Sequence, residues 1–283
     1  MGVRMVRSVR EQGDVIAAPR LSDRPAAYGL IRECLQINDA GAQPSQLASF
    51  IGVRPLSRKA HTWYAGVLGE LAVAELLLTL GPEWRIFHSV PVGVGENDID
   101  HLLIGPGGVF AMNTKHHRGA KVWVAGPSVL VNGQKVGYVQ KAETEARRVS
   151  DCLRDSLRSA AVPVTPVVVL VGPRKLTVRT APREVSFVRD EQLLDWLREQ
   201  PTVLSAHEIE AIAAGADLYT TWHSRPESLD ATLQVTARFD RLRAEVAAAD
   251  RRWRGTQRAI QIAGMGVVAI AAMGAFAAFF LLV

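Results

Sequence analysis

Residues 97–115 read NDIDHLLIGPGGVFAMNTK, and this stretch decides the fold of the chain. Two largely apolar runs, 99–104 and 109–115, lie on either side of a Pro-Gly-Gly triplet at 106–108. Apolar strands separated by such residues are typical of a β-hairpin, because Pro and Gly adopt the backbone angles that a tight turn needs. The stretch therefore predicts two antiparallel strands joined by a turn.

Polar side chains interrupt this apolar hairpin. On a strand, Asn113 and Lys115 point to the same face. A turn at 106–107 places Asp100 across from Asn113, and a turn at 107–108 places it across from Lys115. Both registers cluster the three side chains. Because a buried charge is costly unless it is paired or bound to a metal, this cluster indicates a functional site.

The segments around the hairpin predict an α/β domain. Residues 61–80 are apolar nearly all round, which predicts a buried helix that ends at a Gly-Pro pair. Residues 163–171 (PVTPVVVLV) are typical of a strand that is covered on both faces. Shorter signals predict strands at 84–92, 122–124, 129–131 and 185–188, and helices at 140–158, 190–199 and 205–222. Asp190 is expected to cap the second of these helices, and Ser205 with Glu208 forms a capping box for the third.

Composition limits the class of protein. Lys and Arg total 33 against 28 Asp and Glu, and the net charge of +5 is compatible with nucleic acid or an anionic membrane surface as partner. Cys34 and Cys152 lie far apart and outside any C-x-x-C spacing, which argues against a disulfide framework or a zinc site and favours a reducing cytosolic compartment. Charges interrupt every apolar run of residues 1–19, so we expect no signal peptide.

Residues 262–283 form a run without a charge. A helix of this length spans about 33 Å at about 1.5 Å per residue, which is enough to cross a bilayer. Four arginines precede the run, at positions 251, 252, 254 and 258, and the positive-inside rule places them on the cytoplasmic side. We therefore expect a single-pass, tail-anchored membrane protein whose main domain faces the cytoplasm. The alternative for this run is a buried core helix.

Two segments, GVLGELAVAELL at 66–77 and NDIDHLLIGPGGVFAMNTKHHRGAKVWV at 97–124, carry a resemblance to a known family. Over roughly residues 60 to 172 the chain resembles the nuclease-related domain (NERD) family, which is related to the PD-(D/E)XK nucleases. The resemblance implies a restriction-endonuclease-like fold, in which helices flank a mixed central sheet. The expected organisation is a basic, loosely ordered leader at 1–59, a NERD-like domain at 60–200, a helical extension and stalk at 201–258, and a transmembrane helix at 262–283.

The resemblance also implies a metal-dependent site. In such nucleases two strand carboxylates, often helped by a Glu of the first helix, bind a divalent cation, and a Lys orients or activates the attacking water. Glu70 matches the helix acid, Asp100 the strand acid and Lys115 the lysine. Asn113 stands where the second carboxylate usually stands. Mg²⁺ or Mn²⁺ is the expected cofactor, because a hard cation prefers oxygen ligands and makes bound water more acidic.

Asn113 departs from the family pattern. Its amide oxygen can ligate a cation but brings no negative charge, which weakens the site and leaves the pKa of Lys115 less raised. Asp98 could supply the missing charge, or it could start its strand through turn hydrogen bonds. Lys115 could also form a purely structural ion pair with Asp100.

Several further candidates have two explanations. Periodicity allows either Glu70 or Glu75 as the helix acid, and only the resemblance selects Glu70. His116 and His117 diverge on a strand, so we expect them at the surface or facing phosphate rather than sharing one ion. Gln140 resembles a glutamine that follows the lysine strand in related nucleases, and we expect nucleic-acid contacts from it and from the two histidines.

Three functions remain open. The first is a Mg²⁺-dependent nuclease that acts on DNA through Glu70, Asp100, Asn113 and Lys115. The second, favoured by the missing carboxylate, is a membrane-tethered module that binds nucleic acid without cleaving it. The third is a scaffold at the membrane surface, whose Arg-rich stalk meets anionic lipid.

Overall fold

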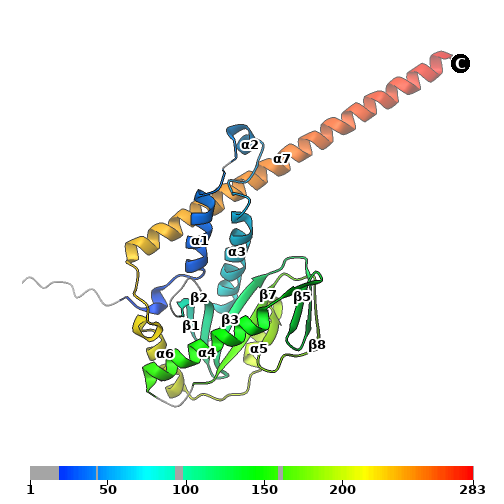
Figure 1. The fold of residues 1–283 in the computed structure, drawn as a ribbon. Coiled ribbons are helices and arrows are strands. Elements are labelled where there is room, and N and C mark those ends of the chain that lie inside the picture. Colours follow the sequence, from blue (N-terminus) through cyan, green and yellow to red (C-terminus); the bar gives the residue numbers. More distant parts are fainter. Residues whose placement is uncertain (1–18, 43, 93–97, 159–161, 283) are drawn as a thin grey trace, which may run out of the picture.

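The computed structural model describes residues 19–42, 44–92, 98–158 and 162–282, and at residues 260 and 262–282 it describes the backbone alone. The chain forms two β-sheets with helices packed against them, and one long helix extends away from the rest (Figure 1). This mixed α/β architecture confirms the prediction of an α/β fold in which helices flank a mixed sheet. Asn97, the first residue of the stretch that decides the fold, lies outside the described residues.

The larger sheet has the strand order β1-β2-β3-β7-β9. Its strands are β1 (Arg85–Pro91), β2 (Asp98–Gly105), β3 (Gly108–His116), β7 (Val164–Val171) and β9 (Ser186–Arg189). The first three strands are antiparallel, and β7 and β9 continue the sheet in parallel. The last six residues of β7 are buried, which confirms the prediction of a strand covered on both faces.

The hairpin of β2 and β3 turns at Pro106–Gly107. The first residue of β3, Gly108, has φ +118°, a conformation that side chains larger than hydrogen rarely adopt. The register of the hairpin places Asp100 across from Asn113, which is the first of the two arrangements that the sequence allowed.

Four helices cover the two faces of the larger sheet. They are α3 (Ala60–Leu77) and α5 (Leu193–Arg198) on one face, and α4 (Tyr138–Leu157) and α6 (Ala206–Ala216) on the other. Alternate residues of a strand point to opposite faces, so on β3 Phe110 and Met112 pack toward α3, whereas Val109 and Ala111 pack toward α4. The strands of this sheet are therefore buried on both sides, where polar side chains need partners.

Two helix boundaries differ from the prediction. Asp190 begins a short 3-10 helix, and its carboxylate accepts the Gly172 N–H instead of capping α5, which starts at Leu193. Ser205 caps α6 through the predicted capping box, but the helix ends earlier than expected, at Ala216.

A smaller sheet lies beside the larger one, with the strand order β6-β5-β4-β8. Its strands are β4 (Lys121–Ala125), β5 (Ser128–Val131), β6 (Gln134–Val136) and β8 (Lys175–Thr180). On its inner face Val122, Val124 and Val129 pack against α4 and β7. The sequence did not predict β8, because KLTVRT has only two apolar residues and stays largely exposed.

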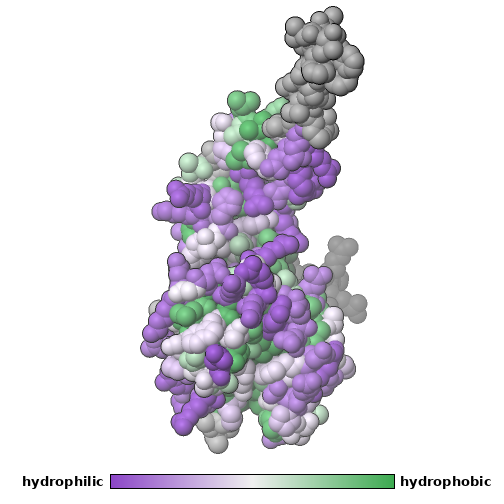
Figure 2. All heavy atoms as spheres, turned by 90° about the vertical axis from the view of Figure 1, so that its right-hand side faces the viewer, coloured by the Kyte–Doolittle hydropathy of each residue, from purple (hydrophilic) through white to green (hydrophobic). Residues whose placement is uncertain are grey.

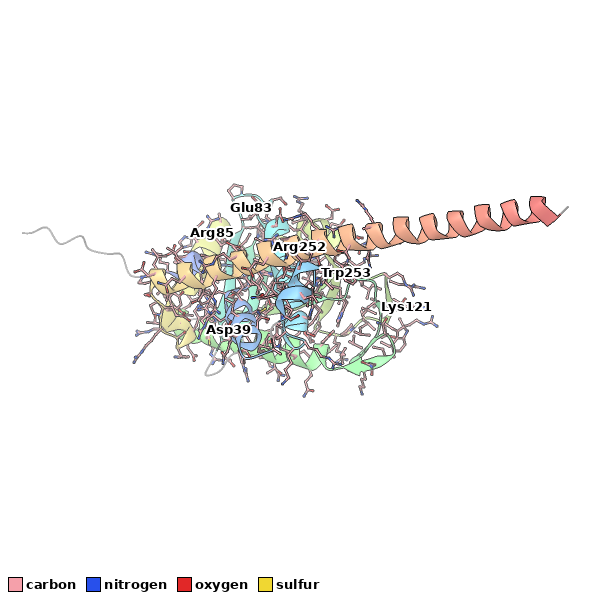
Figure 3. The ribbon with its side chains drawn as sticks, turned by 90° about the horizontal axis from the view of Figure 1, so that it is seen from above. Asp39, Glu83, Arg85, Lys121, Arg252 and Trp253 are labelled. Atoms are coloured by element: carbon pink, nitrogen blue, oxygen red, sulfur yellow. The ribbon has the colours of Figure 1, made fainter. Side chains whose placement is uncertain are left out.

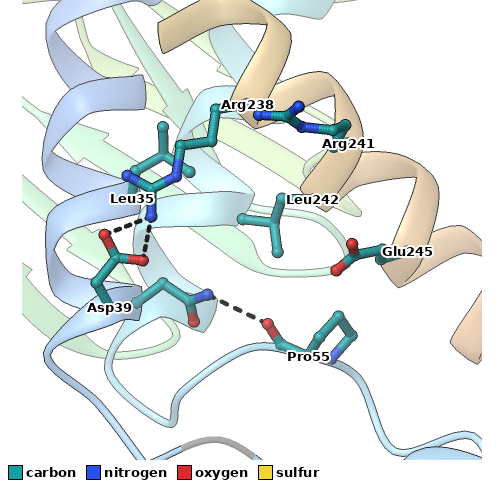
Figure 4. Close-up of a pocket in the computed structure, with 8 residues that line it drawn as sticks. Leu35, Asp39, Pro55, Arg238, Arg241, Leu242 and Glu245 are labelled. Atoms are coloured by element: carbon teal, nitrogen blue, oxygen red, sulfur yellow. Dashed lines mark hydrogen bonds and ion pairs between the residues drawn. The ribbon is translucent and has the colours of Figure 1, made fainter. Parts of the chain in front are cut away.

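The N-terminal helices pack against the last helix of the chain. α1 (Tyr28–Asp39) and α2 (Gln46–Phe50) contact α7 (Leu229–Leu282), whose residues Phe239 and Val246 are buried. At the end of α1, both oxygens of Asp39 bind Arg238 of α7 across 2.5 and 2.6 Å (Figure 4). We expected a loosely ordered leader at 1–59; its described part is instead helical and packed, because its partner lies 199 residues further along the chain.

Among the residues whose side chains are described, no helix is long and apolar enough to cross a membrane. The predicted transmembrane segment at 262–283 lies outside that set, although the backbone of α7 is helical as far as Leu282. The transmembrane segment therefore stays a prediction.

Candidate active site

α3, β2 and β3 meet around a cavity of about 430 Å³. Its lining includes Glu70 from α3, Asp98 and Asp100 from β2, Lys115 from β3, and Lys141 from α4. Four of these residues were predicted for the site from the sequence: Glu70, Asp100, Lys115 and, as a possible further ligand, Asp98. The fold thus brings side chains from three separate elements to one place.

Glu70 reaches the cavity because α3 lies close to β3. A Cβ at Gly69 would be 2.9 Å from the Cβ of His116, closer than real Cβ atoms approach, so glycine is required at this crossing. The adjacent Glu70 is 7% exposed and lines the cavity. Glu75, which periodicity alone could not separate from Glu70, is exposed. Of these two glutamates, only Glu70 lines the cavity.

Two carboxyl groups in the cavity are held in an environment that opposes their ionisation. Burial raises the pKa of Asp100 to about 6, although Lys115 and the backbone N–H of Thr114 act in the opposite direction. That N–H donates to Asp100 Oδ2 across 2.5 Å. The pKa of Glu70 is raised well above its usual value, first by burial and then by the charge of Asp100. A positive ion between them would stabilise both carboxylates.

Lys115 supplies a positive charge beside these carboxyl groups. Its Nζ donates to Asn113 Oδ1, and to the Thr114 carbonyl oxygen across 3.2 Å. The same Nζ lies 5.5 Å from the centre of the Tyr138 ring. Burial lowers the pKa of Lys115, although Asp100 opposes this effect. The amine is therefore held in place and releases its proton more readily than a surface lysine.

Asn113 connects Lys115 to a second, buried carboxylate. The Asn113 side chain is 4% exposed, and its Nδ2 donates to Glu145 Oε2 across 2.8 Å. Glu145, on α4, is 6% exposed, and its other oxygen lies 3.4 Å from Lys141 Nζ. Sequence reasoning missed Glu145 and Lys141. The available signal was their i, i+4 spacing, with Glu145 at a position where the helical period of α4 requires an apolar residue.

Asp98 lines the cavity but already has a cationic partner. Arg24 Nη2 binds Asp98 Oδ2 across 2.8 Å, and the two side chains are 9% and 17% exposed. Burial raises the pKa of Asp98, and Arg24 lowers it. Because its charge is compensated by Arg24, Asp98 is poorly suited to replace the carboxylate that is missing at position 113.

The two histidines after Lys115 have different partners, as expected for neighbours on a strand. His116 Nδ1 lies 2.6 Å from the Ala65 carbonyl oxygen, and His117 Nε2 lies 2.7 Å from the Tyr138 hydroxyl, on whose ring it stacks. Both histidines line the cavity, whereas Gln140 is exposed on α4 outside its lining. Nucleic-acid contacts by these three residues stay predictions.

Glu70 of α3, Asp100 of β2 and Lys115 of β3 thus share one cavity. All three residues lie in a segment that matches a known protein family. Residues 65–171 match the family model of the nuclease-related domain. The matched segment begins within α3 and ends with β7, and it contains every cavity-lining residue named above, from Glu70 to Lys141. No curated protein and no solved structure matches the chain.

The nuclease-related domain implies a divalent cation, and the chemistry of the cavity fits one in part. Glu70 and Asp100 offer the hard oxygen ligands that such a cation prefers, and burial raises the pKa of both groups, an effect that a bound cation would oppose. Within the part of the chain that the structure describes, no group of three or more His, Cys, Asp and Glu side chains is arranged to hold a metal ion. Two carboxylates suffice for Mg²⁺, which usually keeps several water ligands.

Proposed function

We propose that this protein hydrolyses phosphodiester bonds of nucleic acid, with DNA as the substrate. The observation that supports this most strongly is the convergence of Glu70, Asp100 and Lys115 on one cavity within the nuclease-related domain. Lys141 lines the same cavity, and two cationic side chains there suit an anionic phosphate.

Glu70 and Asp100 are the residues that would hold the divalent cation, Mg²⁺ or Mn²⁺. When bound, such a cation supplies charge stabilisation at the phosphate and lowers the pKa of a coordinated water. The Thr114 N–H keeps Asp100 in position through its hydrogen bond. Burial, which raises the pKa of both carboxyl groups, makes the site more stable with the cation than without it.

Lys115 would position the attacking water. Asn113 holds its amine in place, and burial lowers its pKa, so that a larger share of the amine is neutral and able to accept a proton. In its protonated form the same group stabilises negative charge that develops on the phosphate.

A second candidate function is a module that binds nucleic acid without cleaving it. The observation that favours it is Asn113, an uncharged amide where related nucleases carry a carboxylate. Glu145 does not compensate directly, because it does not line the cavity and is bound to Asn113 and Lys141.

Cleavage of supercoiled, linear and single-stranded DNA by the purified protein, with Mg²⁺ or Mn²⁺, separates the two functions. We expect cleavage that requires the cation and is lost in Asp100→Ala and Lys115→Ala. Glu75→Ala is the matched control for Glu70→Ala, because both residues lie on α3 and only Glu70 reaches the cavity. DNA retention on a gel that weakens with salt, without product, would support the binding module. A protein that shows neither property would be a scaffold.

We also propose that residues 262–283 anchor the protein in a membrane, with the main domain in the cytoplasm. The supporting features are the uncharged run itself and the arginines just before it. A protein that ends at Gln257 keeps the part of α7 that packs on α1 and should stay in the supernatant, whereas the full chain should sediment with membranes. A shortened protein that still sediments would show that this segment is not the sole tether.

A further inference from the structure

The outer face of the smaller sheet carries side chains that the proposed active site does not use. Along β4, Val122 and Val124 are buried whereas Lys121 and Trp123 are exposed, so alternate residues point inward and outward. Trp123 is 36% exposed. In Figure 2, which views the molecule from the side where β5 and β8 lie in Figure 1, hydrophilic side chains surround smaller hydrophobic areas.

Strand register places other side chains beside Trp123 on this face. Trp123 pairs with Leu130 of β5 and with Thr177 of β8, and Leu130 pairs with Lys135 of β6. Directly paired residues of neighbouring strands point to the same face of a sheet. One row across the four strands therefore contains a lysine, a leucine, the tryptophan and a threonine.

Two lysines lie side by side in the next row. Lys121 of β4 pairs with Lys175 of β8, and both are exposed. Directly paired like charges repel and destabilise a sheet. Residues 118–141 and 172–183, which contain all four strands, hold eight Lys and Arg but no Asp or Glu. No ion pair within the described residues involves Lys121, Lys175 or Lys135. A bound anion would therefore reduce the repulsion between Lys121 and Lys175.

Short connections join the strands of this sheet to residues of the candidate active site. β3 ends at His116, which lines the cavity, and β4 begins at Lys121. At the β6 edge of the sheet, Tyr138 follows β6 closely and contacts the cavity residue His117. Figure 3 shows Lys121 on the outer side of the molecule, away from Asp39 on α1.

We propose that the outer face of the smaller sheet binds a single strand of nucleic acid. Bases stack on Trp123, and phosphates are bound by Lys121, Lys135 and Lys175. An aromatic side chain among cations is the combination that binds single strands without reading their sequence, because every base has a face that stacks. A lysine patch alone would suit any polyanion, and the exposed tryptophan adds a face on which unpaired bases stack. The link to the proposed function is that this strand would be the one held for cleavage.

The test measures binding of a fluorescein-labelled oligothymidylate of about 20 nucleotides by the full-length chain, through fluorescence anisotropy. EDTA is present, so that cleavage does not interfere. Lys121→Glu with Lys175→Glu should weaken binding about tenfold at about 0.1 M salt and reduce its salt dependence, because two phosphate contacts are lost. Trp123→Ala should weaken binding by a similar factor and leave the salt dependence unchanged.

Matched controls come from other surfaces. Arg148→Glu reverses an exposed charge on α4, and Trp253→Ala removes a tryptophan of α7 that is 43% exposed. Both control proteins should bind as the unaltered protein does. Equal weakening by the controls, or no weakening by the sheet variants, would overturn the proposal. So would sheet variants that lose binding to phosphatidylserine vesicles while keeping oligothymidylate affinity, because the face would then be a membrane patch.

The outcomes for this surface and for the active site are separable. Asp100→Ala should lose cleavage and keep oligothymidylate binding. Binding that depends on Trp123 in a protein that cleaves nothing would refute the nuclease and support the surface. Cleavage in a protein whose binding ignores the sheet variants would refute the surface and support the nuclease.

Discussion

The amide nitrogen of Asn113 donates a hydrogen bond to the carboxylate of Glu145 across 2.8 Å. Both side chains are buried, so this bond decides which end of the amide faces Lys115. The oxygen does, and it accepts the lysine Nζ. The reverse orientation would set oxygen against carboxylate and donor against donor. Glu145 therefore orients Asn113, which in turn holds Lys115.

Removing the acceptor of this bond should destabilise the protein. Glu145→Ala removes the acceptor of the buried Asn113 Nδ2, and we expect the free energy of unfolding to fall by about 1–3 kcal/mol in urea titrations. Glu145→Gln keeps an acceptor oxygen and should lose less. The control is Glu143→Ala, two residues earlier on α4, which should stay within about 0.5 kcal/mol. Equal stability of the two alanine variants would contradict the role given to Glu145.

Restoring a carboxylate at position 113 should strengthen metal binding, but only if Glu145 is also neutralised. Asn113→Asp alone sets two buried carboxylates against each other, and we expect a lower melting temperature at pH 8. The double variant with Glu145→Gln should bind Mn²⁺ about tenfold more tightly than the unaltered protein, as followed by the metal dependence of the melting temperature. If all three proteins respond to Mn²⁺ alike, the side chain at 113 does not contribute to the cation site.

The buried charge of Asp100 should make stability depend on pH. Its folded pKa, about 6, lies above the ordinary value of 3.8, so its contribution is full below pH 3.8 and is lost as pH rises through 6. That difference corresponds to about 3 kcal/mol at most. Without metal, Asp100→Asn should therefore raise the free energy of unfolding at pH 8, and raise it less at pH 5. Mn²⁺ should stabilise the unaltered protein at pH 8 but not the variant; the same Mn²⁺ response in both would rule Asp100 out as a ligand.

A histidine pair in β1 and β2 should affect the pH dependence of stability in the opposite direction from Asp100. His88 Nδ1 and His101 Nδ1 lie 2.8 Å apart, and burial lowers the pKa of both rings below 6.5. Neutral rings are required in the fold, so their contribution is present above pH 6.5 and is lost as pH falls. Each proton that the folded protein excludes changes stability by about 1.4 kcal/mol per pH unit. His101→Leu should reduce the slope of the free energy of unfolding against pH between pH 7 and 5. His61 is exposed, and His61→Ala should leave this slope unchanged. Unchanged slopes in both variants would refute this.

Local sequence patterns predicted much of the fold. The alternation and turn residues around Pro106–Gly107 predicted the hairpin, the apolar helix before it predicted α3, and the β-branched run predicted β7. The same local reading placed Asp100, Asn113 and Lys115 together, because residues paired in a hairpin are close in the sequence. It left open the register, and the choice between Glu70 and Glu75. Tertiary structure decided both, since only packing against the sheet shows which side of α3 is buried.

The sequence by itself therefore determined the features that depend on residues close in the chain. These are the strand period, the helix period, the turn residues and the identity of the hairpin side chains. Tertiary structure alone decided the contacts between distant segments, such as Arg238 with Asp39, Arg24 with Asp98, and Asn113 with Glu145. Glu145 and Asn113 break the apolar pattern of their own elements, but such a break does not say which distant residue is the partner. Their free energy arises when a charge or amide is buried beside another, and that requires the packed chain.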